Sequence, residues 1–241
     1  MTTLQRINLW SSPRNVSTAL MYSFAERPDT HVLDEPLYGH YLRHQPTAAR
    51  HPHAELVMQH QPEDGERVQQ QLLTADYGRP VLVAKQMTHH LVAFDYKPLL
   101  RLPGVLLIRD PRRILASYHE QVDEVTARDI GLPQQLALAA ELRSRGTLAA
   151  VLDARRLLLD PAGQLQRLCE RLHLEYTPRM LTWQAGPRTY DGVWASDWYA
   201  NAHRSTGFAP YRARTVELSP KLAAIAEEVQ PMYDELLAEA L

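Results

Sequence analysis

Residues 5–34 read QRINLWSSPRNVSTALMYSFAERPDTHVLD and carry the signals of a strand, a loop, a helix and a second strand. The apolar run Ile7–Trp10 predicts the first strand. A helical pattern of apolar residues then covers 15–27 and ends at Pro28, and His31–Leu33 predicts the second strand. Two strands joined by one helix form a βαβ unit, in which the strands lie parallel. The stretch therefore predicts a three-layer α/β fold with a central, mostly parallel sheet.

The remaining chain continues this alternation. Further apolar runs predict strands at 81–84, 104–108 and 148–152. Helices are predicted at 66–77, 111–128, 133–145, 161–172 and 221–241, the last with a kink or break at Pro231. The polar segment 39–80 is predicted to be a helical excursion with loops. With 241 residues and no break in composition, we expect one α/β domain over 1–241.

Composition and charge argue against several classes of protein. The formal net charge is −2, so no general affinity for nucleic acid or an anionic membrane is expected. The N-terminal residues show no signal-peptide pattern, and no apolar run reaches the about eighteen residues of a spanning helix. The single cysteine, Cys169, lies in a helical pattern and is expected to be buried and inert. These features predict a cytoplasmic protein without internal disulfides.

Polar residues follow the ends of four predicted strands. The first strand runs into 11–18, the second into Asp34 and Glu35, the third into Lys85 and the fourth into Arg109. In an open parallel sheet, ligands bind in the crevice beyond the carboxyl ends of the strands. We therefore expect these four polar segments to face one crevice.

The loop Ser12–Leu20 has the features of an anion site. It precedes a helix, whose first turn has unpaired backbone N–H groups and the positive end of the macrodipole. Arg14 adds charge, while Ser17 and Thr18 add hydroxyl donors. Ordinary serine caps are the alternative explanation. The loop lacks the Walker A pattern G-x-x-x-x-G-K-[ST], which disfavours an ordinary ATP or GTP kinase.

A second candidate phosphate contact follows the strand 104–108. Arg109 ends that strand, and Ser117 lies eight residues later in the next predicted helix. The two side chains could clasp one phosphate. Arg112 and Arg113 at the start of this helix oppose its dipole unless an anion is near, which favours binding over an exposed basic helix start.

Together, the loop pattern P-[KR]-x-x-[ST]-[ST] and the later pattern R-[DN]-P-x-x-x-x-x-S resemble the P-loop sulfotransferase family, in its bacterial type. The helix that begins at Asp160-Pro161 is similar to a third motif of that family. The resemblance covers most of 5–180 and implies a P-loop-like strand–loop–helix. Glycine commonly stands where this chain has Val16, so we expect Asn15 to take any positive φ that the loop needs.

The resemblance also implies a co-substrate, 3'-phosphoadenosine 5'-phosphosulfate, and the residues that hold it. The 5'-phosphosulfate would lie on Arg14, Asn15, Val16, Ser17 and Thr18. The 3'-phosphate would lie on Arg109 and Ser117. The C-terminal phosphate loop of some members is missing, and its part is assigned here to Arg204, Ser205, Thr206 and Gly207.

Sulfuryl transfer needs a base for the acceptor and cations for the leaving oxygens. Glu35 is the first candidate base because it directly follows a strand end, with structural pairing to an arginine as the alternative. His89 or His90 is the other candidate, by similarity to a K-T-H segment of the family. Lys85 and Arg14 are the candidates for stabilising the leaving oxygens.

The acceptor is expected to be a small molecule with a hydroxyl or an amine. The eleven histidines show no metal-ligand spacing, so no metal is predicted. Aromatic residues gather between Trp183 and Tyr211 and could line the acceptor pocket, stack on adenine or pack in the core.

An ATP-dependent phosphotransferase and an inactive nucleotide-binding module are alternative functions. A homo-oligomer is compatible with the sequence.

Overall fold

The computed structural model describes residues 4–45, 51–119, 124–213 and 215–241. In these residues, five parallel strands form one sheet in the order β2-β3-β1-β4-β5. The strands are β1 (Gln5–Ser11), β2 (Thr30–Asp34), β3 (Val81–Met87), β4 (Gly104–Ile108) and β5 (Leu148–Asp153). The predicted α/β fold with a mostly parallel sheet is therefore confirmed, and the described strands are all parallel.

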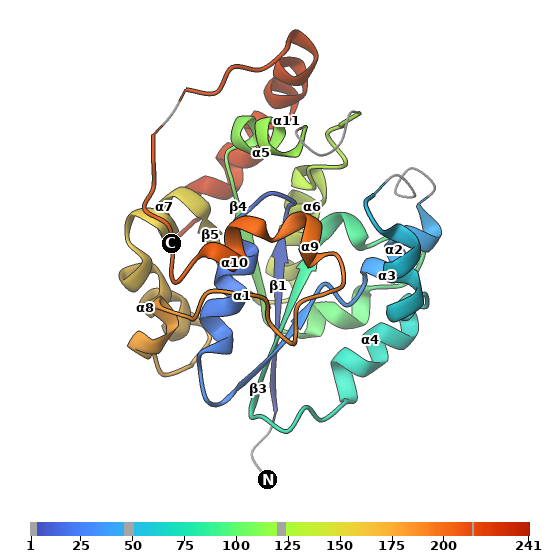
Figure 1. Ribbon diagram of the computed structural model, residues 1–241, viewed down its shortest axis with the longest axis vertical. Coiled ribbons are helices and arrows are strands. Elements are labelled where there is room, and N and C mark those ends of the chain that lie inside the picture. The colour runs from blue at the N-terminus through green and yellow to red at the C-terminus, as the bar shows by residue number, and fades with distance from the viewer. Residues whose placement is uncertain (1–3, 46–50, 120–123, 214) are drawn as a thin grey trace.

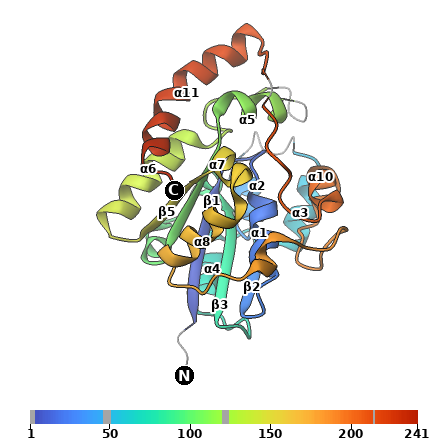
Figure 2. The ribbon, with the colours of Figure 1, turned by 90° about the vertical axis from the view of Figure 1, so that its left-hand side faces the viewer.

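Helices cover both faces of the sheet and complete three layers (Figure 1). The α-helices are α1 (Ser17–Ala25), α2 (Tyr38–His44), α3 (Ala54–His60), α4 (Gly65–Thr74), α5 (Pro111–Tyr118), α6 (Leu132–Ser144), α7 (Ala154–Leu159), α8 (Pro161–Arg171), α9 (Ala195–Trp198), α10 (Ala200–Arg204) and α11 (Pro220–Ala238). The described residues also form short 3₁₀ helices at η2 (Thr88–His90), η3 (Lys97–Arg101) and η4 (Pro178–Leu181). Figure 2 shows α1 and α6 on opposite sides of the sheet.

Successive residues of a strand point to opposite faces of the sheet, and a core cluster of buried side chains lies on each face. Trp10 of β1 packs with α6 and α11 in one cluster, whereas its neighbour Leu9 packs with α1 and α8 in the other. All seven residues of β3 are buried. Strands buried on both faces are typical of parallel sheets that lie between helix layers.

Several predicted boundaries differ from the observed ones. The helix predicted over 66–77 ends at Thr74. The helix predicted over 111–128 ends at Tyr118, and 120–123 lie outside the described residues. The C-terminal helix continues through Pro231, where a kink or break was predicted. The strand predicted over 81–84 extends to Met87, because its polar residues Lys85 and Gln86 find buried partners on neighbouring elements. The strand extension places Lys85 inside the sheet.

The order of the strands creates the crevice that the sequence predicts. β1 lies between β3 and β4, so the chain crosses β1 on its way from β3 to β4. A reversal of this kind is a topological switch point, where open α/β sheets bind ligands. Ser11 at the end of β1 pairs with Met87 of β3 and Leu107 of β4, so the carboxyl ends lie together. No helix in the described part of the chain is long and apolar enough to span a membrane.

Candidate functional site

A pocket opens at the carboxyl ends of β1, β2 and β3. It brings together eight of the predicted site residues, namely Arg14, Asn15, Ser17, Thr18, Glu35, Lys85, His89 and His90. The remaining lining residues are Pro13, Tyr38, His51, Met87, Tyr118, Trp194, Trp198 and Tyr199. The loop that the sequence assigns to an anion and the candidate base therefore share one cavity.

The first loop takes its turn at Arg14 and not at the predicted Asn15. Arg14 has a φ of 53°, whereas Val16 has an ordinary φ of −87°. Valine is thus compatible with this backbone, and the loop needs no glycine at that position. The Asn15 side chain instead braces the loop. Its amide donates to the carbonyl of Leu107 at 2.9 Å, and its oxygen accepts from the Val16 N–H at 2.8 Å.

Helix α1 begins at this loop without a side-chain cap. Within the described residues, the hydroxyls of Ser17 and Thr18 make no hydrogen bond to another side chain or carbonyl. The first-turn N–H groups and these two hydroxyls are therefore available to a ligand. Unpaired donors at the positive end of a helix dipole favour an anion.

The second motif contacts the first loop. The Nε of Arg14 donates to the Ser117 Oγ at 2.9 Å, and the Arg109 guanidinium donates to the Arg14 carbonyl. Asp110 caps α5 by accepting from the N–H groups of Arg112 and Arg113. Arg109 and Ser117 are not lining residues of the pocket, but both lie beside the loop that lines it. The two predicted phosphate motifs are thus adjacent in the fold.

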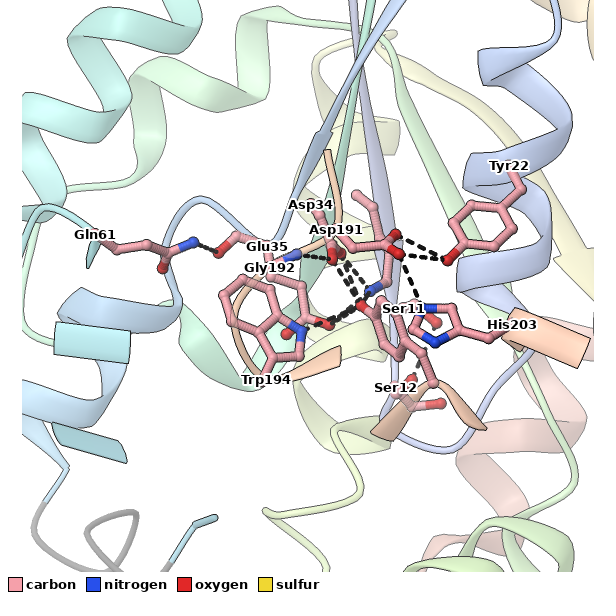
Figure 3. A network of polar contacts seen from close by, with 12 residues as sticks. Ser11, Ser12, Tyr22, Asp34, Glu35, Gln61, Asp191, Gly192, Trp194 and His203 are labelled. Carbon is pink, nitrogen blue, oxygen red and sulfur yellow. Dashed lines mark hydrogen bonds and ion pairs between the residues drawn. The ribbon is translucent and has the colours of Figure 1, made fainter. Parts of the chain in front are cut away.

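A buried ion cluster that includes Asp34 and Glu35 borders the pocket (Figure 3). Lys85 is fully buried, and its Nζ donates to Asp34 Oδ1 at 2.7 Å, to Glu35 Oε1 at 2.6 Å and to the Tyr199 hydroxyl. The Tyr199 hydroxyl in turn donates to the Asp34 carboxylate at 2.8 Å. All three ammonium hydrogens of Lys85 therefore have an acceptor.

Charge and burial set the protonation of this cluster. Burial raises the pKa of Glu35 and the neighbouring Asp34 adds to this effect, while the charge of Lys85 opposes it. Burial alone would lower the pKa of Lys85, but the two carboxylates raise it. Lys85 is therefore held as a cation. Two carboxylates share one ammonium, so Glu35 binds a proton more readily than an exposed glutamate does.

Backbone geometry fixes Glu35. Its φ of 45° lies in the left-handed region, and its N–H donates to the Lys85 carbonyl at 2.9 Å. The Gln61 amide donates to the Glu35 carbonyl at 3.1 Å. A non-glycine residue held in this region by several contacts is often functional.

A segment from the C-terminal part of the chain covers the ion cluster. The Gly192 N–H donates to the Asp34 carboxylate at 3.1 Å, and the Trp194 Nε1 donates to the Tyr199 hydroxyl at 3.2 Å. Asp191 accepts from the Tyr22 hydroxyl of α1 and contacts His203 at 2.9 Å (Figure 3). These contacts tie the segment 191–203 to both α1 and β2.

The structure divides the aromatic residues predicted near the C-terminus. Trp194, Trp198 and Tyr199 line the pocket. Trp183, Tyr190 and Phe208 pack in the core beside α1, and Cys169 is buried in the same cluster. Their spacing alone cannot separate these two groups, because both are interleaved between 183 and 208.

Histidines and tyrosines form one wall of the pocket. The ring of His90 stacks on Tyr38, at a centroid distance of 5.0 Å, and on Tyr41, at 4.6 Å. Burial lowers the pKa of His89 to about 3, and it lowers the pKa of His90 well below the ordinary range. Both imidazoles are therefore neutral and weaker bases than an exposed histidine. Glu35 is the stronger candidate for the base.

The structure places 204–207 away from the pocket. The Trp183 N–H donates to the Thr206 carbonyl, its Nε1 donates to the Ser205 Oγ, and Gly207 bridges to Thr182. Arg204 donates to the Asn201 side chain. The segment after Gly207 contacts α5, because the Arg113 guanidinium of that helix donates to the Tyr211 hydroxyl at 2.9 Å. The phosphate role of 204–207 stays a prediction.

The site combines a helix start with unpaired donors, a buried carboxylate and the side chains of Arg14 and Lys85. Among the described residues, no group of three or more His, Cys, Asp or Glu side chains could hold a metal ion.

Comparison with known proteins identifies relatives of the whole fold. A family model described as "Sulfotransferase domain" matches residues 5–238. The fold resembles the sulfotransferase domain from the curacin biosynthetic pathway, with a TM-score of 0.54 and 16% identity over the full length of both chains. It also resembles a sulfotransferase from Alicyclobacillus acidocaldarius, with a TM-score of 0.56 and 12% identity over 98% of this chain and 97% of that one.

Two Arabidopsis thaliana proteins are closer in sequence. Branched-chain-amino-acid aminotransferase-like protein 1 is 36% identical over 231 residues, and protein 2 is 32% identical over 232 residues. The alignments cover 95% and 96% of this chain. The chain spans only 41% of the length of either relative.

The buried ion cluster makes a prediction about stability. Lys85→Met should lower the free energy of unfolding by about 3–5 kcal/mol, because it leaves Asp34 and Glu35 buried without a cation. Part of this loss should be recovered at low pH. In the folded variant burial still raises the pKa of Glu35 and Lys85 no longer opposes it, so protonation of Glu35 removes one of the two buried charges and relieves their repulsion. Urea unfolding at neutral and acidic pH measures both effects.

The exposed Lys97→Met is the matched control and should change stability by less than about 0.5 kcal/mol. Equal unfolding free energies for the wild type and Lys85→Met would show that the cluster contributes nothing to stability.

Proposed function

Because the chain belongs to the sulfotransferase family, we propose that it transfers a sulfuryl group from 3'-phosphoadenosine 5'-phosphosulfate to a hydroxyl or an amine of a small molecule. The enzyme class follows from the family model over 5–238, whereas the donor and the acceptor are the proposal. The observation that carries it is the shared pocket, which is lined both by the loop Arg14–Thr18 and by Glu35.

The start of α1 supports the donor assignment. A phosphosulfate is an anion, and the uncapped first turn with Ser17 and Thr18 offers it unpaired donors. Arg109 and Ser117 lie next to this loop, where a second phosphate of the same nucleotide could reach them. Arg14 and Ser117 contact each other, so a bound nucleotide would exchange that contact for contacts with phosphate.

The transfer step assigned to this pocket is an in-line displacement. Glu35 takes the proton of the acceptor hydroxyl while the acceptor oxygen forms a bond to sulfur. The bond between sulfur and the phosphate oxygen breaks, and adenosine 3',5'-bisphosphate leaves. The leaving oxygen gains negative charge, which Arg14 at the pocket wall is placed to stabilise.

Lys85 positions the candidate base Glu35. Its three donors are engaged by Asp34, Glu35 and Tyr199, so it holds Glu35 in the pocket. Stabilisation of the leaving oxygen by Lys85 stays a prediction, since it requires the ammonium to exchange one of these partners.

The nucleotide assignment predicts a selective loss of binding. Arg109→Ala should weaken binding of adenosine 3',5'-bisphosphate by about 1.5–3 kcal/mol, because it removes a charge-assisted contact with the 3'-phosphate. AMP lacks that phosphate and should bind almost as it does to the wild type. Titration calorimetry with both nucleotides measures the difference.

Arg101→Ala, at an exposed arginine of η3, is the control and should leave the preference for the bisphosphate intact. An equal loss for both nucleotides in Arg109→Ala would assign Arg109 to bracing the Arg14 carbonyl instead.

The base assignment predicts an acidic limb in the pH profile. Glu35 accepts a proton only when ionised, and burial raises its pKa, so kcat/KM should fall as pH drops through a pKa above the usual glutamate range. Glu35→Gln should remove this limb and lower turnover by about 10²–10⁴-fold. Affinity for the nucleotide should stay near that of the wild type, as measured in parallel.

The exposed Glu66→Gln serves as the control for this experiment. Retained turnover in Glu35→Gln, together with lost turnover in His90→Asn, would transfer the role of base to the histidine. Loss of nucleotide binding in Glu35→Gln would make the carboxylate structural.

A further inference from the structure

His89 and His90 are buried without hydrogen bonds. Their exposed fractions are 4% and 1%, and both line the pocket. Neither ring nitrogen of either side chain has a partner among the described residues, and the Nδ1 atom of each is fully buried. Other histidines of the same region are paired. His40 contacts the carbonyls of Glu63 and Val92, and His51 contacts the Tyr38 hydroxyl.

Unpaired buried polar groups are costly and rare, so their retention calls for an explanation. Packing alone does not provide one, because phenylalanine could make the same ring stacks on Tyr38 and Tyr41 without a polar atom to bury. A ligand in the pocket could pair with the Nε2 atoms of the two rings, which, unlike the Nδ1 atoms, are not fully buried. The two rings lie next to each other, with centroids 4.6 Å apart, and therefore can act on one group of a ligand.

The chemistry of the two rings selects the kind of group. Burial keeps both imidazoles neutral, and a neutral imidazole has one N–H donor and one acceptor nitrogen. A hydroxyl both donates and accepts, so it satisfies such a pair. A carboxylate only accepts, and it would also lie in the pocket that holds the carboxylate of Glu35. An ammonium only donates.

This group must differ from the one that reacts. The reacting hydroxyl gives its proton to Glu35, which is held by Lys85 and Tyr199. The histidines are separate from this network, because His90 stacks on Tyr38 and neither ring is hydrogen-bonded to Glu35 or Lys85 among the described residues. The pocket is also lined by the aromatic side chains of Tyr118, Trp194 and Trp198, which suit an uncharged carbon skeleton.

We propose that the acceptor is an uncharged diol, with one hydroxyl sulfated at Glu35 and a second hydroxyl held by His89 and His90. This inference rests on the proposed sulfuryl transfer and adds the substrate class to it. The two histidines therefore determine which acceptor is used, whereas Glu35 takes the proton.

The acceptor panel on the wild type tests this directly. Cyclohexanol is compared with the cyclohexane-1,2-diols and cyclohexane-1,3-diols, so that only the second hydroxyl changes. The best diol should exceed cyclohexanol by about tenfold in kcat/KM, mostly through KM, since a paired hydroxyl is worth about that factor. A diol that is no better than cyclohexanol would overturn the proposal, as would a stronger preference for 2-aminocyclohexanol or for 2-hydroxycyclohexanecarboxylate.

Variants of the histidines provide an independent readout. His89→Phe and His90→Phe should reduce the preference for the diol to about one, while the melting temperature stays equal or rises because an unpaired polar group is removed. His31→Phe is the matched control, since His31 is also stacked on a tyrosine, Tyr77, but lies outside the pocket. A preserved diol preference in both pocket variants would overturn the proposal. So would a lowered melting temperature that the control does not share, which would mark the histidines as structural.

Stabilisation by adenosine 3',5'-bisphosphate distinguishes a failure of the diol proposal from a failure of the proposed function. If adenosine 3',5'-bisphosphate stabilises the protein but no alcohol of the panel is sulfated, the diol proposal fails and the donor assignment stands. If the bisphosphate does not stabilise the protein, the proposed function itself fails.

Discussion

The pairing of Lys85 with Asp34 and Glu35 is the constraint on which the site depends. Lys85 and Asp34 are register partners on adjacent strands, and Glu35 follows at the end of β2. A fully buried ammonium is tolerated only with compensating charges, and here two carboxylates and the Tyr199 hydroxyl supply them. The same contacts anchor the segment 191–203 over the sheet, because Gly192 and Tyr199 both bind Asp34. The cluster thus holds the candidate base, closes the pocket and connects distant parts of the chain.

The pocket combines two chemically different halves. On one side, the start of α1 offers unpaired donors and positive charge to an anion, and Arg109 and Ser117 lie beside it. On the other side, a carboxylate with a raised pKa faces aromatic rings and two neutral imidazoles. In phosphoryl transfer, positioning and electrostatics supply most of the rate, and sulfuryl transfer between these halves makes the same demand. The strand order explains why the halves meet, since both lie at the switch point of one sheet.

Much of this could be predicted from local sequence signals. Four strand ends with polar residues predicted the crevice, and the structure places Arg14, Glu35 and Lys85 in one pocket. The partners of these residues could not be predicted, because Tyr199 is 114 residues from Lys85 and no local pattern records a contact of that range. The positive φ falls on Arg14 since Asn15 is engaged as a brace between the loop and β4, which only the tertiary structure shows. The helix after β4 ends at Tyr118 although its apolar pattern continues, so the pattern alone did not mark its end.

The most direct test of the account is the melting temperature of the protein with adenosine 3',5'-bisphosphate compared with AMP at equal concentration. A ligand that binds only the folded state stabilises it by about 2.7 kcal/mol at a hundredfold excess over Kd. We expect a clearly larger rise with the bisphosphate, because only that nucleotide carries the 3'-phosphate that Arg109 and Ser117 would bind. Equal rises with the two nucleotides, or none with either, would contradict it.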